Sequence, residues 1–140
     1  MTAGVRTFVE DTYSAASIST DLTLEQDAAR ANLGGNWRMS TDDEYQELLD
    51  NCNVVWTDNY NGTGVAGMVF TSRVNGNSVF FPAAGFCYNS SVEYVGSFGY
   101  YWSDSWDSEY TAWSLYFNFV RQYLYNDLRY YGFSVRGVCE

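Results

Sequence analysis

The chain has 140 residues, which is within the usual size of one domain with a single hydrophobic core. Its 17 acidic residues outnumber seven basic ones, all arginine, and the net charge of -10 disfavours nucleic acid as a partner, because nucleic-acid binders gather positive charge on one surface. The sequence has no histidine, so the commonest general base and every Ser-His or Cys-His nucleophile pair are excluded.

The hydropathy pattern predicts a soluble, folded chain. No apolar run approaches the roughly 20 residues that a membrane-spanning helix needs, so we expect no membrane insertion. Residues 1–10 contain no basic stretch followed by an apolar core, which is the pattern of a signal peptide. Two alternatives follow: the chain is cytosolic at synthesis, or a targeting segment lies outside this sequence.

Three cysteines, Cys52, Cys87 and Cys139, allow at most one disulfide. Their spacing matches no metal motif, and without histidine the usual zinc ligand sets cannot be assembled. We therefore expect no metal and no other cofactor. We interpret the three side chains as small buried thiols of the core, with one disulfide as the alternative.

Two capping-box spacings predict two helices in the first part of the chain. In a capping box, two side chains three residues apart satisfy each other's free backbone N–H at the start of a helix. Thr23 and Gln26 have this spacing ahead of a helix over residues 24–33, which stops at two glycines. Thr41 and Glu44 repeat it ahead of a second helix, whose buried face is formed by residues at helical spacing. That face consists of Tyr45, Leu48, Leu49 and Cys52.

The pattern then changes to short strands. Residues 67–74 and 77–81 predict a hairpin, because Asn75-Gly76 between them supplies the positive backbone angles of a tight two-residue turn. Loops are predicted at residues 61–64 and 89–91. Helices followed by antiparallel strands predict the α+β class.

The last 42 residues hold 14 aromatic side chains, of which eight are tyrosine. Each buried tyrosine hydroxyl needs a hydrogen-bond partner, so a plain core cannot use so many, and we expect many of them to be exposed. Alternation along residues 112–118 separates two faces of a strand. The inward face is predicted to hold Trp113, Leu115 and Phe117, and the outward face Ser114, Tyr116 and Asn118.

The same alternation extends beyond this strand. Val120 and Leu124 are predicted to point inward, and Arg121, Tyr123 and Tyr125 outward. Asn126 and Asp127 are expected to form a turn. A final strand is expected to close the core with Phe133, Val135 and Val138.

Five segments occur in a characteristic order, at residues 34–41, 47–52, 81–85, 99–103 and 132–136. Together they resemble the FISUMP-type domains of gut bacteria and their phages, and the resemblance extends from about Leu22 to Glu140. It implies a C-type-lectin-like fold over the single domain 1–140, with two helices packed on a small mixed or antiparallel sheet and long irregular loops. Ser40 departs from the proline usual in the family, which puts only the local turn in doubt.

The tail is most similar to the variable proteins of diversity-generating retroelements, in which adenines of a template repeat are miscopied. Such copying changes AAC or AAT codons into those for residues such as Tyr, Asn, Asp, Ser, Phe, Leu and Arg, but not into those for Trp. The resemblance implies a variable ligand-binding region at about residues 104–131, with Trp102, Trp106 and Trp113 as fixed scaffold. Its implied diversified positions are Asp107, Tyr110, Ser114, Tyr116, Asn118, Tyr123, Tyr125, Asn126, Asp127, Tyr130 and Tyr131, followed by Phe119, Arg121, Leu128 and Thr111.

This resemblance implies a non-enzymatic receptor-binding or adhesin domain on a bacterial cell surface or a phage particle. Its partner would be a protein or a glycan on a cell or phage surface, with further domains or other copies of the chain as additional partners. Tyrosine offers a large rigid contact, and Ser, Asn and Asp supply adaptable hydrogen bonds, as in antibody paratopes. The alternatives are a carbohydrate-active or formylglycine-generating-like enzyme on the same fold, and a structural surface or pilus subunit.

Several polar residues have competing interpretations. The carboxylates of Asp104, Asp107 and Glu109 allow a glycosidase pair, but they are part of no recognisable motif. The run Trp102-Ser103-Asp104 is similar to the Trp-Asn-Asp of calcium-dependent lectins, although the partner calcium motif is missing, and we interpret Asp104 as a solvated loop acid. Arg38 and Arg136 are predicted to pair structurally with a helix carboxylate.

Overall fold

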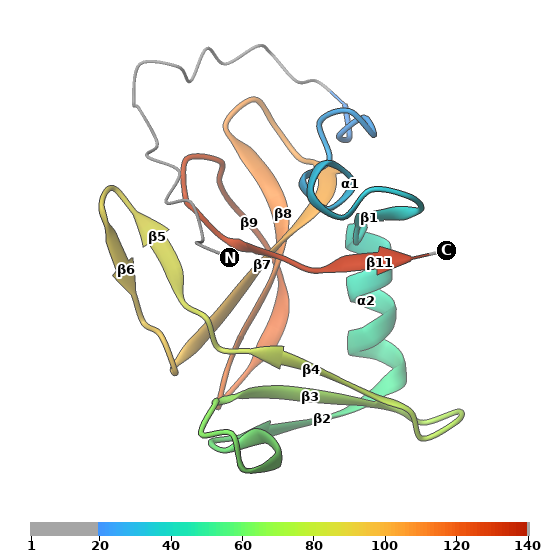
Figure 1. Cartoon of the computed structure of the whole chain (residues 1–140), viewed down its shortest axis with the longest axis vertical. Helices are drawn as coiled ribbons and strands as arrows, with labels where there is room; N and C mark the ends of the chain where they lie inside the picture. Colours follow the sequence, from blue (N-terminus) through green and yellow to red (C-terminus); the bar gives the residue numbers. More distant parts are fainter. Residues whose placement is uncertain (1–19, 140) are drawn as a thin grey trace.

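The computed structural model describes residues 20–139 and has the predicted α+β composition (Figure 1). Its helical elements are α1 (Ala28–Leu33), α2 (Asp42–Asn51) and the 3-10 turn η2 (Tyr60–Gly62). Its strands are β1 (Trp37–Met39), β2 (Cys52–Thr57), β3 (Gly67–Ser72), β4 (Ser78–Pro82), β5 (Phe86–Tyr88), β6 (Ser91–Glu93), β7 (Phe98–Trp106), β8 (Thr111–Asn118), β9 (Gln122–Leu128), β10 (Ser134–Val135) and β11 (Gly137–Cys139).

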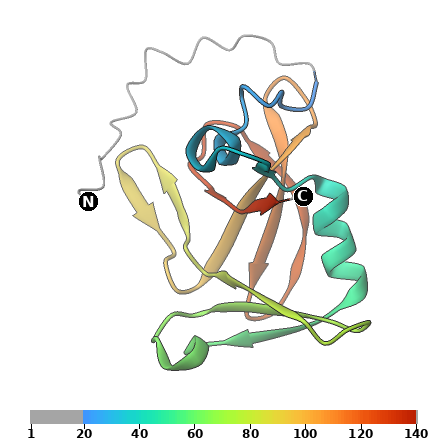
Figure 2. The same ribbon diagram turned by 45° about the vertical axis from the view of Figure 1, so that its right-hand side comes forward.

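The largest sheet carries the aromatic C-terminal third of the chain. Its four strands have the order β10-β7-β8-β9, with antiparallel pairing except between β10 and β7, which are parallel. α2 contacts β7, β8 and β9, and it covers one side of this sheet (Figure 2). β1 pairs with β11, so segments from the two ends of the described chain lie side by side.

Two smaller sheets complete the architecture. β2, β3 and β4 form an antiparallel sheet at the bottom of Figure 1. β5 and β6 form a separate hairpin at the left of the same view. The backbone of Cys87 in β5 pairs with that of Gly132, near the end of the chain. This hairpin therefore lies beside the C-terminal segment, although more than 40 residues separate them.

The core lies between α2, the four-stranded sheet and the β2-β3-β4 sheet. Its largest buried side chains are Tyr45, Phe70, Phe81, Leu115 and Phe117. The inward positions Leu115 and Phe117 confirm the alternation predicted for β8. Two core tyrosines satisfy their hydroxyls by donating to backbone carbonyls, Tyr45 to Trp102 (3.3 Å) and Tyr101 to Pro82 (2.7 Å).

The second predicted helix is confirmed, and the first is shorter than predicted. Thr41 and Glu44 form the complete capping box of α2, in which each side chain accepts from the other's backbone N–H. α1 begins only at Ala28, because Asp27 caps it. One carboxylate oxygen of Asp27 accepts from Arg30 N (2.9 Å), and the other from Met39 N of β1 (2.7 Å). Residues 23–26 form a separate turn ahead of this cap.

The hairpin predicted from Asn75-Gly76 forms between β3 and β4, but its turn is not the tight two-residue type. That type needs positive φ at both central residues. Here only Gly76 has one, at 74°, and Asn75 does not. The chain turns over residues 73–76 instead, closed by the hydrogen bond from Ser72 N to Asn77 O (2.8 Å). The hydrophobic pattern therefore predicted the pairing correctly, while the dipeptide predicted the wrong turn.

Three predictions for the C-terminal segment are wrong. Asn126 and Asp127 do not form a turn, because they continue β9 and pair with Trp113 and Ala112 of β8. Val120 does not point inward: it lies in the turn between β8 and β9 and is 65% exposed. Val135 is also exposed rather than part of the core.

The rest of the predicted final strand is only partly buried. Val138 belongs to β11, away from the central core cluster, and Phe133 packs on Trp102 with a ring-centroid distance of 4.3 Å. Trp102 lies on the face of the sheet opposite Leu115 and Phe117, as the register of β7 and β8 requires. Phe133 therefore covers the outer face of the sheet.

Candidate functional site

The four-stranded sheet has an outer face that is rich in tyrosine. The register places Tyr100, Tyr116 and Tyr123 opposite one another on β7, β8 and β9, with Tyr125 two residues further along β9. The intervening residues Tyr101, Leu115 and Leu124 point to the core. We call the eight neighbouring tyrosines on this side the tyrosine face. It consists of Tyr88, Tyr94, Tyr100, Tyr116, Tyr123, Tyr125, Tyr130 and Tyr131.

Ring contacts connect the tyrosine face into one layer. The centroids of Tyr100 and Tyr116, and those of Tyr116 and Tyr123, are 5.0 Å apart, and Tyr125 follows at 6.1 Å from Tyr123. Phe86 of the β5-β6 hairpin lies 5.2 Å from Tyr100 and 5.4 Å from Tyr131. These spacings are those of favourable aromatic pairs, so contacts between neighbouring rings help to hold the rings of the layer in place.

Several of these rings remain accessible. Tyr123, Tyr125 and Tyr130 are 38%, 50% and 56% exposed, and Tyr116 is half-buried. Tyr110 is exposed as well, so the predicted exposure is confirmed for four of the tail tyrosines, and Tyr116 is not sealed from water. Phe119, Arg121 and Leu128 are also exposed. Their contact with a ligand stays a prediction.

Ser114 is not at the surface, although its position on β8 predicts it there. Its exposed fraction is 0%. Its hydroxyl lies within hydrogen-bond distance of Tyr125 O (3.1 Å) and of Oδ2 of Asp127 (3.0 Å). Asn118 is likewise structural: its Oδ1 accepts from Val120 N and Arg121 N in the β8-β9 turn. Neither side chain is placed to vary freely.

The acids of the predicted variable region are also held by neighbours. Asp107 accepts hydrogen bonds from Thr111 Oγ1 and from Asn126 Nδ2 (3.1 Å). Burial raises the pKa of Asp127, and the Ser114 hydroxyl partly offsets this effect. Thr111 is itself half-buried. The structure therefore divides the predicted positions into exposed rings and a hydrogen-bonded layer beneath or beside them.

Hydroxyl interactions within the tyrosine face modify its chemistry. The hydrogen bond between Tyr131 and Tyr130 raises the pKa of Tyr131. Burial, followed by the neighbouring hydroxyl of Tyr116, raises the pKa of Tyr100. Burial likewise raises the pKa of Tyr116, and Arg121 opposes this effect. These hydroxyls stay protonated at neutral pH, so they can donate as well as accept hydrogen bonds.

Three members of the tyrosine face, Tyr88, Tyr94 and Tyr100, are absent from the predicted ligand positions, because all three precede the predicted variable region. Tyr88 and Tyr94 lie in or next to the β5-β6 hairpin, whose strands have three residues each and show no clear alternation. The sequence signal for this hairpin is Asn89, because asparagine is one of the residue types that tolerate positive φ. In the structure Asn89 has a φ of 52° in the turn between the two strands. The turn alone does not predict which side the hairpin presents to the sheet.

A pocket of about 200 Å³ opens at the β8-β9 end of the tyrosine face. Three rings and one carboxylate define it, and we call it the turn pocket. It is lined by Trp56, Asp58, Gly96, Ser97, Phe98, Asn118 and Phe119. The Phe98 ring lies 6.0 Å from the Tyr116 ring, so the pocket is continuous with the tyrosine face.

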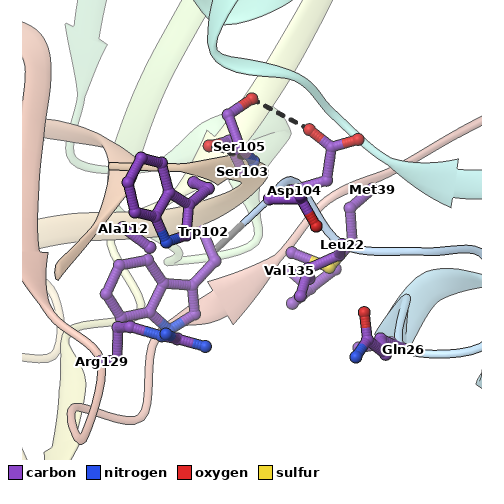
Figure 3. Close-up of a pocket in the computed structure, with 13 residues that line it drawn as sticks. Leu22, Gln26, Met39, Trp102, Ser103, Asp104, Ser105, Ala112, Arg129 and Val135 are labelled. Atoms are coloured by element: carbon purple, nitrogen blue, oxygen red, sulfur yellow. Dashed lines mark hydrogen bonds between the residues drawn. The ribbon is translucent and has the colours of Figure 1, made fainter. Parts of the chain in front are cut away.

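A second pocket of about 200 Å³ lies at the other end of β7, beside the start of the described chain (Figure 3). Its walls include Leu22, Met39 and the indoles of Trp102 and Trp106. Figure 3 shows the hydrogen bond between the Asp104 carboxylate and Ser105, which measures 3.0 Å. Asp104 lies within β7 and is half-buried, so it is not the solvated loop residue that the sequence predicts, and this burial raises its pKa.

The remaining predictions concern scaffold residues. Arg38 pairs with Glu44 of α2 at 2.7 Å, as predicted, and this guanidinium lowers the pKa of Glu44. Among residues 20–139, Arg136 pairs with no carboxylate: it donates to Phe80 O (3.0 Å) and lies over the Phe81 ring. All three cysteines are thiols, but only Cys52 is buried, while Cys87 and Cys139 are exposed.

Within residues 20–139, no group of three potential metal-ligating side chains comes together. No helix in that range has the length and apolar character needed to cross a membrane.

A family model described as a domain of unknown function, DUF8237, matches residues 37–138. The chain belongs to the DUF8237 family. The DUF8237 match begins at β1 and ends within β11, so it includes the whole tyrosine face and the turn pocket, while α1 precedes it. No curated protein and no solved structure matches the chain.

Proposed function

We propose that the tyrosine face binds a protein or glycan ligand, and that the chain is a binding domain rather than an enzyme. The observation that carries this proposal is a continuous layer of eight tyrosines whose most exposed rings take no part in the core. Exposed aromatic rings gathered on one surface favour association, and they are typical of recognition sites. Their hydroxyls add hydrogen bonds that a purely apolar patch lacks.

The hydrogen bonding of the acids favours binding over catalysis. A glycosidase needs two carboxylates facing one substrate, one of them as acid and the other as base or nucleophile. Asp104 is hydrogen-bonded to Ser105, and Asp107 is engaged by Thr111 and Asn126. Both carboxylates therefore have the hydrogen-bond partners of structural acids, and this favours a binding role over a glycosidase pair.

The C-type-lectin-like fold and the origin of the tail in retroelement diversification belong to the same proposal. The α+β order of elements agrees with the fold assignment, and the exposure of Tyr110, Phe119, Tyr123, Tyr125 and Tyr130 agrees with exchangeable positions. We further propose display on a bacterial cell surface or a phage particle. A near-copy of the tail in the encoding DNA, differing only where the copy has adenine, would support the genetic origin. Differences spread over all four bases would exclude it.

A display library tests the binding function without knowledge of the natural ligand. Codons for Tyr110, Phe119, Tyr123, Tyr125 and Tyr130 are randomised, and folded clones are selected against a panel of unrelated proteins and glycans. A control library randomises five exposed apolar positions elsewhere, which are Leu24, Leu33, Val55, Val65 and Val74. We expect the first library to stay folded and to yield binders that the control does not. Equal yields from both libraries, or loss of folding in the first, would contradict the proposal.

A further inference from the structure

We propose that the turn pocket receives a basic side chain, arginine or lysine, of a protein partner seated on the tyrosine face. This inference rests on the proposed function, because the same partner must contact the tyrosine face. It adds the chemistry of the group that anchors that partner. Three observations support it: the position of the pocket, the groups that line it and the charge of the chain.

The position makes the turn pocket reachable from the tyrosine face. Phe98 lines the pocket and contacts Tyr116, and Phe119 forms its exposed rim in the β8-β9 turn. The opposite wall comes from Trp56 at the end of β2 and from Asp58 just after it. An engineered apolar cavity of about 150 Å³ holds one benzene molecule, so a pocket of this size admits the end of one long side chain.

The lining offers acceptors and aromatic faces but few donors. The N–H groups of Gly96, Ser97 and Phe98 already donate to Ala83 O or Tyr94 O, at 2.7 to 3.1 Å. The Asn118 amide donates to the Tyr116 hydroxyl (2.8 Å). An anion placed here would find little beyond the Ser97 hydroxyl to bind it, whereas a cation would find a carboxylate and rings.

The carboxylate of Asp58 has unused capacity. Its Oδ1 accepts from the indole N–H of Trp56 (2.7 Å), which fixes its orientation. Among residues 20–139, Asp58 has no other hydrogen bond and no ion pair, so Oδ2 is left for a ligand. A guanidinium or ammonium at this oxygen would lie beside the rings of Trp56 and Phe119, an arrangement that favours cations.

The charge of the whole chain acts in the same direction. A net charge of -10 attracts basic partners at long range and repels acidic ones. No arginine is among the described residues that line the turn pocket. Arg121 lies in the β8-β9 turn and is close enough to Tyr116 to oppose the rise of the pKa of Tyr116. We expect Arg121→Ala to strengthen binding of a cation in the pocket.

Small amides of single amino acids test the pocket directly. The indole N–H resonance of Trp56, assigned by its loss in Trp56→Phe, is followed by NMR as Nα-acetyl-argininamide, Nα-acetyl-lysinamide or uncharged Nα-acetyl-norleucinamide is added. We expect saturable shifts with the two cations, stronger for arginine, and binding weakened by added salt. The uncharged norleucinamide should bind at least about fivefold more weakly than argininamide. Equal binding of norleucinamide, or no saturable shift with arginine, would overturn the proposal.

Matched variants separate this pocket from a general charge effect. Asp58→Asn should weaken argininamide binding about fivefold, whereas Asp50→Asn, which removes one exposed acid in α2, should leave it unchanged. Equal effects of the two variants would count against a specific site. A triple variant with Tyr123→Ala, Tyr125→Ala and Tyr130→Ala should bind argininamide as the parent does. Failure of the titration would therefore contradict only cation binding in the turn pocket. Failure of the display library would contradict ligand binding by the tyrosine face.

Discussion

The hydroxyl of Ser114 on β8 lies 3.0 Å from Oδ2 of Asp127 on β9, and Ser114 is completely buried. Both residues belong to the set that the sequence predicts as exchangeable ligand contacts. Their contact joins two neighbouring strands under the tyrosine face, and Asp127 has a pKa raised by burial. Replacement of Ser114 should therefore lower the stability of the fold, rather than change a direct contact with a ligand.

We expect Ser114→Ala to lower the free energy of unfolding by about 1–3 kcal/mol, because the single O–H of Ser114 no longer donates to the half-buried carboxylate of Asp127 or to the carbonyl of Tyr125. The pKa of Asp127 should rise further, since the lost hydroxyl favours its charged form. Urea denaturation measures the first effect and NMR titration the second. Ser90→Ala, at an exposed position in the β5-β6 turn, is the control and should change neither quantity. An unchanged midpoint in Ser114→Ala would show that the pair contributes nothing.

Tyr125→Ala should leave the melting temperature nearly unchanged, because Tyr125 is half-exposed and its inward neighbour Leu124 carries the contact with the core. Leu115→Ala should instead lower the free energy of unfolding by about 2–5 kcal/mol, since Leu115 is fully buried. If Tyr125 is a hot spot, its truncation costs on the order of 2 kcal/mol of binding free energy. Thermal unfolding and affinity for a selected ligand give the two readings. Parallel losses in both for Tyr125→Ala would refute a recognition role.

Local signals predicted the elements that depend on near neighbours. Thr41 and Glu44 satisfy each other within one turn, so their spacing alone fixes the start of α2. Alternation likewise predicted that Leu115 and Phe117 face the core, because successive side chains of a strand point to opposite sides.

The sequence could not predict features that depend on distant segments. Ser114 is on the outer side of β8, as predicted, but Asp127 and Tyr125 from β9 surround its hydroxyl. Asn126 and Asp127 favour turns locally, yet pairing with β8 keeps them in a strand. The turn pocket joins β2 to the β8-β9 turn, about 60 residues away, and no local pattern of Trp56 or Asp58 indicates that meeting.

The contribution of Glu44 to stability should depend on pH. The Arg38 guanidinium and the cap hydrogen bonds lower the pKa of Glu44 in the folded state. Its stabilisation is therefore fully present above the unfolded pKa of about 4.3 and is lost as the pH falls through the lower folded value. Because the pair is half-buried and still partly screened by solvent, Glu44→Gln should lose only about 0.5–1 kcal/mol at pH 7. The difference from the parent should disappear below about pH 3. A constant difference from pH 7 to pH 3 would contradict this assignment.

Gly99 tests how tightly β7 packs against the core. A Cβ added there would overlap the ring of Phe117, which is fully buried. Gly99→Ala should therefore lower the free energy of unfolding by about 3 kcal/mol or more, through overpacking rather than through backbone strain. Phe117→Leu, which shortens the obstructing side chain, should recover part of this loss when combined with Gly99→Ala. In denaturant unfolding, additive losses in the double variant would show that the two residues do not compete for space.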